Sequence, residues 1–119
     1  MSQSAYVLVV EDDDDLRDTM QEVLEHAGLA TVTARDGLDA LRVLGERGLP
    51  NVILLDLVMP TMDGWTFLET LRADPAYAAI PVIVTTSAPS RAPAGLVVLR
   101  KPVTPELVEH HVRQHMRAA

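Results

Sequence analysis

Acidic residues stand at two places in the sequence where a short apolar run ends. Glu11 and Asp12 follow residues 6–10, and Asp56 follows residues 52–55. Carboxylates that leave neighbouring strands repel one another unless a cation lies between them. Because all of these candidate ligands are oxygens, a hard ion such as Mg²⁺ suits them. The sequence therefore predicts a magnesium site formed by Glu11, Asp12 and Asp56.

A hydroxyl group and an ammonium group follow two later apolar runs. Thr86 comes after residues 82–85, and Lys101, the only lysine in the chain, comes shortly after residues 96–99. A lysine is a compact, mobile point charge, which differs from the planar fork of an arginine. A solvated surface lysine is the ordinary alternative. Together with the acids, these two residues predict a site for a metal-bound anion such as phosphate.

Three further aspartates continue the first acidic run but have a different predicted role. Apolar residues at helical spacing begin directly after Asp13, Asp14 and Asp15. Aspartates commonly cap helices and complement the positive end of the helix dipole. We therefore expect these three residues to start a helix near Asp14 and not to bind the ion.

Short β-rich runs alternate with segments of helical period, which is typical of an α/β fold with a parallel sheet. The expected strands are residues 6–10, 30–34, 52–55, 82–85 and 96–99. The expected helices run from about 14 to 27, from 37 to 47, from 64 to 74, and from 104 onward. Open sheets of this class bind ligands at the carboxyl ends of their strands, where the candidate site residues stand.

The helical period also predicts which side chains are buried. They are Leu16, Met20, Val23, Leu24 and Ala27 in the first helix, Leu38, Leu41 and Leu44 in the second, Trp65, Leu68 and Leu71 in the third, and Leu107, Val108 and Val112 in the last.

The connection between the last two strands is unusually short. Only residues 87–95 join them, and they include Pro89 and Pro93. A parallel crossover normally takes a dozen or more residues and usually contains a helix. Proline removes a backbone donor and restricts the residue before it. We therefore expect the helix at this place to be missing or reduced to a turn.

Length and composition narrow the class of protein. The 119 residues suit a single domain with no output domain. A net charge of −7 argues against a nucleic-acid surface, and the absence of cysteine excludes disulfides and thiolate chemistry. The first apolar run lacks the basic leader of a signal peptide, and no run approaches the length of a membrane span. These features predict a cytoplasmic protein that does not bind membranes.

Four motifs resemble the receiver domains of bacterial response regulators, which belong to two-component systems, and in particular the chemotaxis receivers. They are VLVVEDD, VILLDLVMPTMDG, PVIVTTS and LRKP, and together they extend over nearly the whole chain. The resemblance implies a flavodoxin-like, doubly wound sheet of five parallel strands in the order 2-1-3-4-5.

The resemblance also implies a role for each acidic site residue. Asp56 resembles the phosphoacceptor of the family, Asp12 a direct Mg²⁺ ligand, and Glu11 an acid that holds Mg²⁺ through water. The backbone carbonyl of Val58 resembles a further metal ligand.

The chain matches the receiver family at two further site positions and departs from it at one. Thr86 resembles the hydroxyl that bonds the acyl phosphate, and Lys101 resembles the lysine that pairs with it. The Lys101–Pro102 peptide bond is implied to be cis. Val98 stands where receivers usually carry a Tyr or Phe whose rotation reports phosphorylation, so the switch is expected to be altered.

The function implied by the resemblance is phosphoryl transfer from a sensor histidine kinase or a phosphotransfer protein. The phosphorylated domain would then signal to a downstream protein without being a turnover enzyme, and a homodimer is left open. One alternative is a pseudo-receiver, an interaction module that phosphorylation does not control. Another is a metal-dependent phosphohydrolase, although Val58 replaces the second aspartate that such enzymes usually carry.

Two weaker motifs have ordinary explanations. His111 and His115 have a spacing that can bind metal on a helix, but no third ligand is near in the sequence. A polar helix end explains them. A flavodoxin-like cofactor site is opposed by the acids after the first strand, which would repel a phosphate group.

Overall fold

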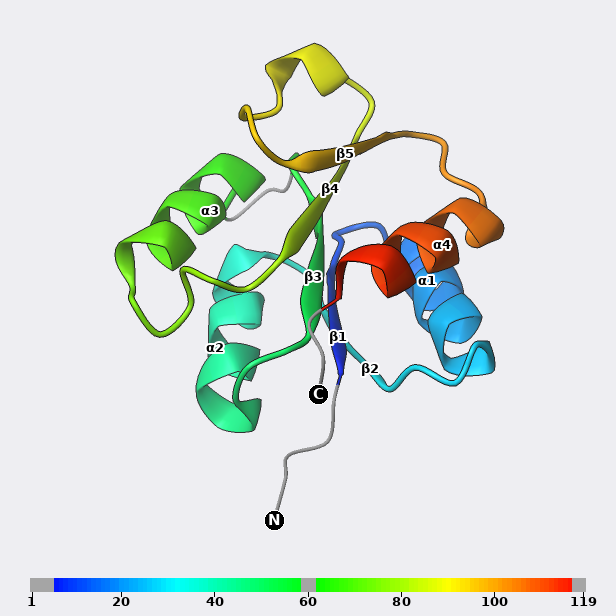
Figure 1. Cartoon of the computed structure of the whole chain (residues 1–119), viewed down its shortest axis with the longest axis horizontal. Helices are drawn as coiled ribbons and strands as arrows, with labels where there is room; N and C mark the ends of the chain where they lie inside the picture. Colours follow the sequence, from blue (N-terminus) through cyan, green and yellow to red (C-terminus); the bar gives the residue numbers. More distant parts are fainter. Residues whose placement is uncertain (1–5, 59–61, 117–119) are drawn as a thin grey trace.

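The computed structural model describes residues 6–58 and 62–116, and within these residues the strands form one parallel sheet (Figure 1). The strands are β1 (Val7–Val10), β2 (Thr31–Ala34), β3 (Val52–Asp56), β4 (Val82–Thr86) and β5 (Val97–Arg100). Their order is β2-β1-β3-β4-β5, and every neighbouring pair is parallel. The predicted doubly wound, flavodoxin-like sheet is thereby confirmed.

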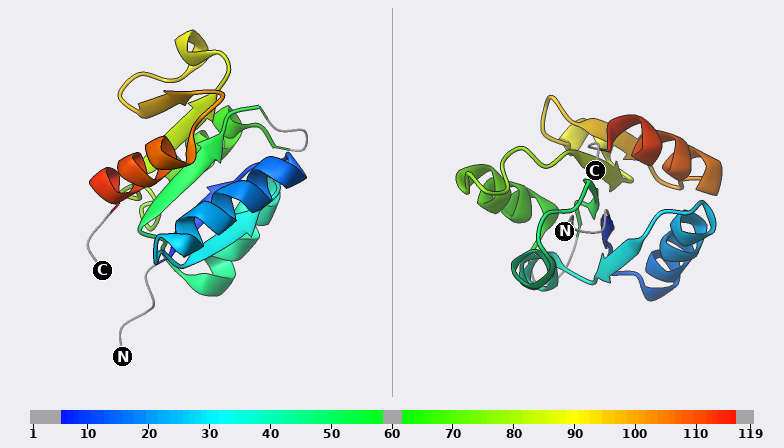
Figure 2. Two further views of the ribbon diagram at one scale, coloured as in Figure 1. Left: turned by 90° about the vertical axis from the view of Figure 1, so that its right-hand side faces the viewer. Right: turned by 60° about the horizontal axis from the view of Figure 1, so that its bottom comes forward.

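Helices cover both faces of this sheet (Figures 1 and 2). Helices α2 (Gly37–Arg47) and α3 (Gly64–Ala73) lie on one face, and α1 (Asp14–His26) and α4 (Pro105–His115) lie on the other. Each begins after a residue whose side chain accepts a hydrogen bond from a backbone amide of the first turn. These caps are Asp13, Asp36, Asp63 and Thr104. None of the described helices is long and apolar enough to span a bilayer.

The central strands are buried along their whole length, as expected for a parallel sheet covered on both faces. Every residue of β1, β3 and β4 is buried. Side chains alternate between a core under α2 and α3 and a second core under α1 and α4. A buried apolar scaffold therefore supports the residues that follow these strands.

Two residues that were predicted to be buried are exposed, so the prediction is wrong for them. Leu38 is 52% exposed and Leu107 is 38% exposed. In α2 the buried face consists of Ala40, Val43 and Leu44, whose spacing of three and four residues keeps them on one side of the helix. Leu38 lies off this stripe. In the same way, Val108 and Val112 form the buried face of α4 and leave Leu107 outside it.

The crossover between β4 and β5 contains no α-helix, as predicted. Its only helical part is η1, a 3₁₀ helix of three residues (Pro89–Arg91). Figure 1 shows this segment rising beyond the end of β4. The indole Nε1 of Trp65, in α3, donates to the carbonyl of Arg91 at 3.1 Å, and the guanidinium of Arg91 lies 5.4 Å from the centre of the indole ring. Trp65 thus anchors the crossover to α3.

Candidate functional site

The sheet register brings the ends of β1, β3, β4 and β5 to one edge. Val10 is paired with Leu55, so Glu11 emerges beside Asp56. Asp56 is paired with Thr85, and the backbone amide of Lys101 donates to the carbonyl of Thr86 at 2.9 Å. Side chains that are 15 to 90 residues apart in the sequence therefore converge because parallel strands end together.

The three acids predicted to hold a cation form one cluster. Glu11, Asp12 and Asp56 each offer a carboxylate oxygen, and these oxygens lie within 4.8 Å of one another. Glu11 is 1% exposed and Asp56 is 4% exposed, whereas Asp12 is exposed to solvent. All three ligands are oxygens, and the site is open to solvent on the side of Asp12. This arrangement fits Mg²⁺, which would take water molecules as its remaining ligands.

Lys101 is the cation that this structure already places among the acids. Its Nζ lies 3.2 Å from Oε1 of Glu11 and 3.4 Å from Oδ1 of Asp56. The Lys101–Pro102 peptide bond is cis, as expected. One ammonium group therefore bridges two buried carboxylates.

The pKa values of Glu11 and Asp56 are raised even though Lys101 lies beside both carboxylates. Burial and the carboxylate of Asp56 raise the pKa of Glu11 to about 7, although Lys101 opposes this. Burial also raises the pKa of Asp56. Burial would lower the pKa of Lys101, but the charges of Glu11 and Asp56 outweigh it and raise that pKa. A further cation would relieve the remaining repulsion between the carboxylates.

The raised pKa of Glu11 predicts that Mg²⁺ binding depends on pH. Binding must displace the proton that Glu11 keeps up to about pH 7. We expect the Mg²⁺ affinity to rise roughly tenfold between about pH 6 and about pH 8, since ligands bind metal in their deprotonated form. Calorimetric titrations across this range would measure the slope, and Glu11→Gln should remove most of it. An equally steep slope in that variant would assign the titration to another group.

The same shift has a consequence for stability without metal. The pKa of Glu11 is higher in the folded state than its ordinary value of 4.5. The unfolded chain therefore ionises first as the pH rises, and the metal-free domain loses stability between that value and the folded pKa.

The remaining predicted site residues lie at the same edge. Thr86 is 2% exposed, and its Oγ1 accepts a hydrogen bond from the amide of Ala88 at 3.0 Å. The amide of Val58 donates to Oδ1 of Asp56 at 3.2 Å, and the Val58 side chain is exposed. The metal-ligand role of the Val58 carbonyl stays a prediction. The Met-Pro pair that contributes to the sequence resemblance lies outside the described residues.

Comparison with known proteins identifies the family of the chain. The family model "Response regulator receiver domain" matches residues 7–112. The chain belongs to this family. It is a chemotaxis-like receiver domain of two-component signalling, and receiver domains act as signalling modules that bind Mg²⁺ at an acidic pocket.

Individual relatives support this assignment. The receiver is 33% identical to Protein PilG of Pseudomonas aeruginosa over 81 residues, which are 68% of this chain and 59% of that protein. Its fold matches the chemotaxis protein CheY4 of Vibrio cholerae with a TM-score of 0.83 and 27% identity, covering 95% of this chain and 99% of the other. The match with the first curated relatives covers less than two thirds of the length of each of those relatives.

A third relative was solved with a metal ion. The receiver domain of a sensor histidine kinase from Pseudomonas aeruginosa, described with magnesium coordinated in its active-site cleft, has a TM-score of 0.83 to this receiver. The two are 24% identical, and the alignment covers 94% of this chain and 97% of the other. This likeness shows a common fold.

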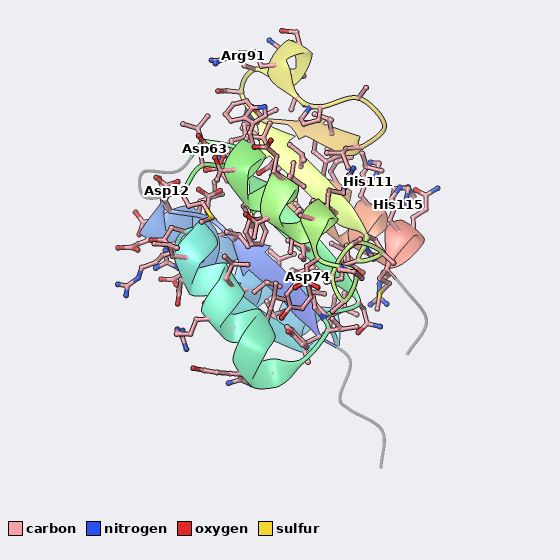
Figure 3. All side chains as sticks on the ribbon, turned by 90° about the vertical axis from the view of Figure 1, so that its left-hand side faces the viewer. Asp12, Asp63, Asp74, Arg91, His111 and His115 are labelled. Carbon is pink, nitrogen blue, oxygen red and sulfur yellow. The ribbon has the colours of Figure 1, made fainter. Side chains whose placement is uncertain are left out.

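The histidines of α4 do not form a comparable site. The rings of His111 and His115 are stacked, with centroids 5.9 Å apart. Figure 3 shows both on the side of the molecule away from Asp12. Within residues 6–58 and 62–116, the acid cluster is the only group of three or more potential metal ligands. The explanation as a polar helix end stays a prediction for His115, whereas burial lowers the pKa of His111 and opposes a cationic imidazole there.

Two contacts in the site region were not predicted from the sequence. The guanidinium of Arg17 donates to the backbone carbonyl of Glu11, and Gly64 lies directly against the backbone that follows Asp56. The pairing of Arg17 with Asp14, three residues earlier on α1, is a local signal that could have pointed to the first. Gly64 belongs to the VILLDLVMPTMDG motif that carries the family resemblance, but the motif does not show its contact with the backbone after Asp56.

The cluster predicts unequal roles for the acids of the β1–α1 region. Replacing Asp12 with Ala is expected to weaken Mg²⁺ binding far more than replacing Asp14 with Ala. Asp12 contributes to the oxygen cluster, whereas the Asp14 side chain is 81% exposed and pairs with Arg17. Calorimetric titration of both variants without phosphate would test this division. Equal losses of affinity would contradict it.

Proposed function

We propose that this receiver accepts a phosphoryl group on Asp56 in a Mg²⁺-dependent reaction and then signals by binding another protein. The observation that carries the proposal is the position of Asp56. Its carboxylate is buried, lies within 4.8 Å of two further acids that can share a cation, and has the ammonium of Lys101 at 3.4 Å. The proposed donor is a phosphohistidine on a sensor kinase or a phosphotransfer protein.

The chemistry requires neutralisation of charge. A carboxylate oxygen of Asp56 would form the bond to phosphorus while the bond from phosphorus to the donor nitrogen breaks. Both reactants are anionic, so the reaction is slow unless cations offset their repulsion. When bound, Mg²⁺ supplies part of that neutralisation. Lys101 supplies the rest from within the chain, because it faces Asp56 before any phosphoryl group arrives.

The residues around Asp56 also hold the acceptor in one orientation. The Val58 amide and the Lys101 ammonium both contact Oδ1 of Asp56, at 3.2 Å and 3.4 Å. A fixed acceptor reduces the orientational freedom that is lost on the way to the transition state. Thr86, buried at the end of the adjacent strand, is the proposed hydroxyl partner of the phosphoryl group.

A pseudo-receiver is the second candidate, because the region that normally reports phosphorylation is altered. The crossover has only η1 in place of a helix, and Val98 has no aromatic ring to rotate. Such a domain would keep the fold and bind partners without phosphate control. The phosphohydrolase is less well supported, since Val58 offers no carboxyl group to act as acid and base.

One experiment separates these three functions. The protein is mixed with acetyl phosphate and Mg²⁺, and phosphorylation is followed by intact mass. Addition of one phosphoryl group per chain supports the receiver. No addition in the presence of Mg²⁺ supports the pseudo-receiver, and continuous turnover of phosphomonoesters supports the hydrolase. The kinase, the downstream target, a stand-alone role, a homodimer and the cytoplasmic location stay predictions.

A further inference from the structure

The segment between β1 and α1 carries two of the three clustered acids, and it must hold them against their mutual repulsion. Glu11 is buried, but Asp12, next to it, is exposed and has solvent on one side. An exposed aspartate in a connecting segment is free to turn toward solvent, which costs metal affinity because the ligand must be ordered on binding. Contacts that orient the backbone at Asp12 therefore bear on the metal site.

Glu11 is held at three points. Its backbone amide donates to the carbonyl of Ala34 at 3.0 Å. Its carboxylate accepts hydrogen bonds from the Lys101 ammonium at 3.2 Å and from the Asp13 amide at 3.2 Å. Its backbone carbonyl accepts a hydrogen bond from Nη1 of Arg17 at 3.1 Å. The last contact is the one that bears on Asp12, because the carbonyl of Glu11 and the amide of Asp12 belong to the same planar peptide unit.

Arg17 reaches this carbonyl from the first turns of α1. Its backbone amide donates to the carbonyl of Asp13 at 2.9 Å, which places the residue in the helix. Its second guanidinium nitrogen, Nη2, lies 2.5 Å from Oδ1 of Asp14. The guanidinium is thus attached to α1 at one side and to the Glu11–Asp12 peptide at the other. The Arg17 side chain is only 17% exposed, so the contact with the carbonyl is partly shielded from water.

We infer that Arg17 is a positioning residue for the metal site, which fixes the Glu11–Asp12 peptide so that the Asp12 carboxylate faces Glu11 and Asp56. The inference rests on the proposed function insofar as the site binds Mg²⁺. Arg17 itself does not contact the metal position; it acts through the peptide bond. The planar fork of the guanidinium suits this task, because its two terminal nitrogens reach two separate acceptors, the carbonyl of Glu11 and the carboxylate of Asp14.

The test is a calorimetric Mg²⁺ titration of the full chain without phosphate. Arg17→Gln is expected to weaken Mg²⁺ binding about tenfold, the size of loss typical for residues that orient metal ligands. Arg17→Lys keeps the positive charge and can still donate to the carbonyl of Glu11, so it should recover part of this loss. Arg42→Gln is the matched control, because Arg42 makes ion pairs with Asp39 and Glu46 on α2 and should leave the affinity within about twofold.

Two further measurements distinguish a role of Arg17 in positioning Asp12 from a general loss of structure in the variant. Without Mg²⁺, Arg17→Gln should still unfold in one cooperative transition well above the temperature of the titration, so that the loss of affinity is measured on folded protein. With acetyl phosphate, the Mg²⁺ concentration for half-maximal labelling should rise about tenfold, while the maximal rate stays within about twofold. A melting temperature that falls while the affinity is unchanged would overturn the inference.

The inference and the proposed function can fail separately. If wild-type protein binds Mg²⁺ and Arg17→Gln weakens that binding, Arg17 has the inferred role even where Asp56 is never labelled. If Asp56 is labelled but Arg17→Gln binds Mg²⁺ as well as the wild type does, the proposed function stands and the inference is wrong. Absence of Mg²⁺ binding by the wild type would overturn the inference directly.

Discussion

Replacing Asp56 with Asn is expected to abolish phosphorylation by acetyl phosphate. The amide has almost the same shape as the carboxyl group, but its oxygen and nitrogen are poor nucleophiles toward phosphorus. The replacement also removes one of the three clustered carboxylates, so Mg²⁺ binding should weaken at the same time. Labelling should fall to background, whereas wild-type protein should take up one phosphoryl group that hydroxylamine removes.

A matched control shows that the loss is local. Asp36→Asn changes the same functional group at the N-cap of α2, where Asn serves as well as Asp. This variant should be labelled like the wild type. The fold of Asp56→Asn should persist, because the change removes a buried negative charge that raises the pKa of Glu11. Undiminished labelling of Asp56→Asn would mean that another residue is the acceptor.

Replacing Gly64 with Ala is expected to destabilise the domain and distort the site. An added methyl group would lie 2.6 Å from Cα of Leu57, 2.9 Å from the backbone oxygen of Asp56 and 2.9 Å from Cδ2 of Leu57. Two of these neighbours are backbone atoms, which cannot rotate away. The amide of Gly64 also donates to the carbonyl of Leu57 at 2.8 Å, so α3 is held close to the end of β3.

We expect a loss of about 3 kcal/mol in the free energy of unfolding, at the upper end of typical overpacking costs. The Gly45→Ala variant is the control. A methyl group there meets no atom within 4 Å, and Gly45 lies in the interior of α2. That change should stabilise by about 0.5–1 kcal/mol, since alanine loses less backbone freedom in a helix. Urea unfolding of both variants would measure the difference. Similar stabilities for the two would show that the backbone near Asp56 can move aside.

Labelling of the two glycine variants would connect stability with chemistry. If Gly64→Ala still folds, the displacement of Leu57 should reach Asp56, and the labelling rate should fall even under conditions where the variant is fully folded. Gly45→Ala should be labelled at the wild-type rate. The contact between α3 and the end of β3 therefore has two expected effects that can be read separately.

The sequence alone was sufficient for the succession of strands and helices along the chain, whereas the order of the strands within the sheet came from the family resemblance. Alternation of apolar runs with helical segments predicts the α/β class, and the position of polar residues at strand ends predicts which of them meet. These inferences succeed because parallel strands end at one edge, whatever the details of packing. The missing helix was also predictable, since a chain of few residues with two prolines cannot coil and still span a strand.

Side-chain depth was less predictable. Leu38 and Leu107 fit an apolar helical stripe in the sequence, yet both are exposed, and Ala40 and Val43 occupy the core of α2 instead. Periodicity indicates which residues share a side of a helix. The rotation of that helix against the sheet decides which side is buried, and it depends on packing with residues distant in the sequence.

Only the tertiary structure showed how the acid cluster is supported. Arg17 could have extended into solvent, but it folds back onto the carbonyl of Glu11. Gly64 could have been an ordinary turn residue, but the backbone after Asp56 passes where its side chain would be. The sequence determined which chemical groups stand at the ends of the strands. The orientation of those groups was decided by contacts that form only when the strands and helices are packed together. A long side chain such as that of Arg17 has many conformations until its neighbours are in place, and the space beside Gly64 is filled only when the backbone after Asp56 packs against it.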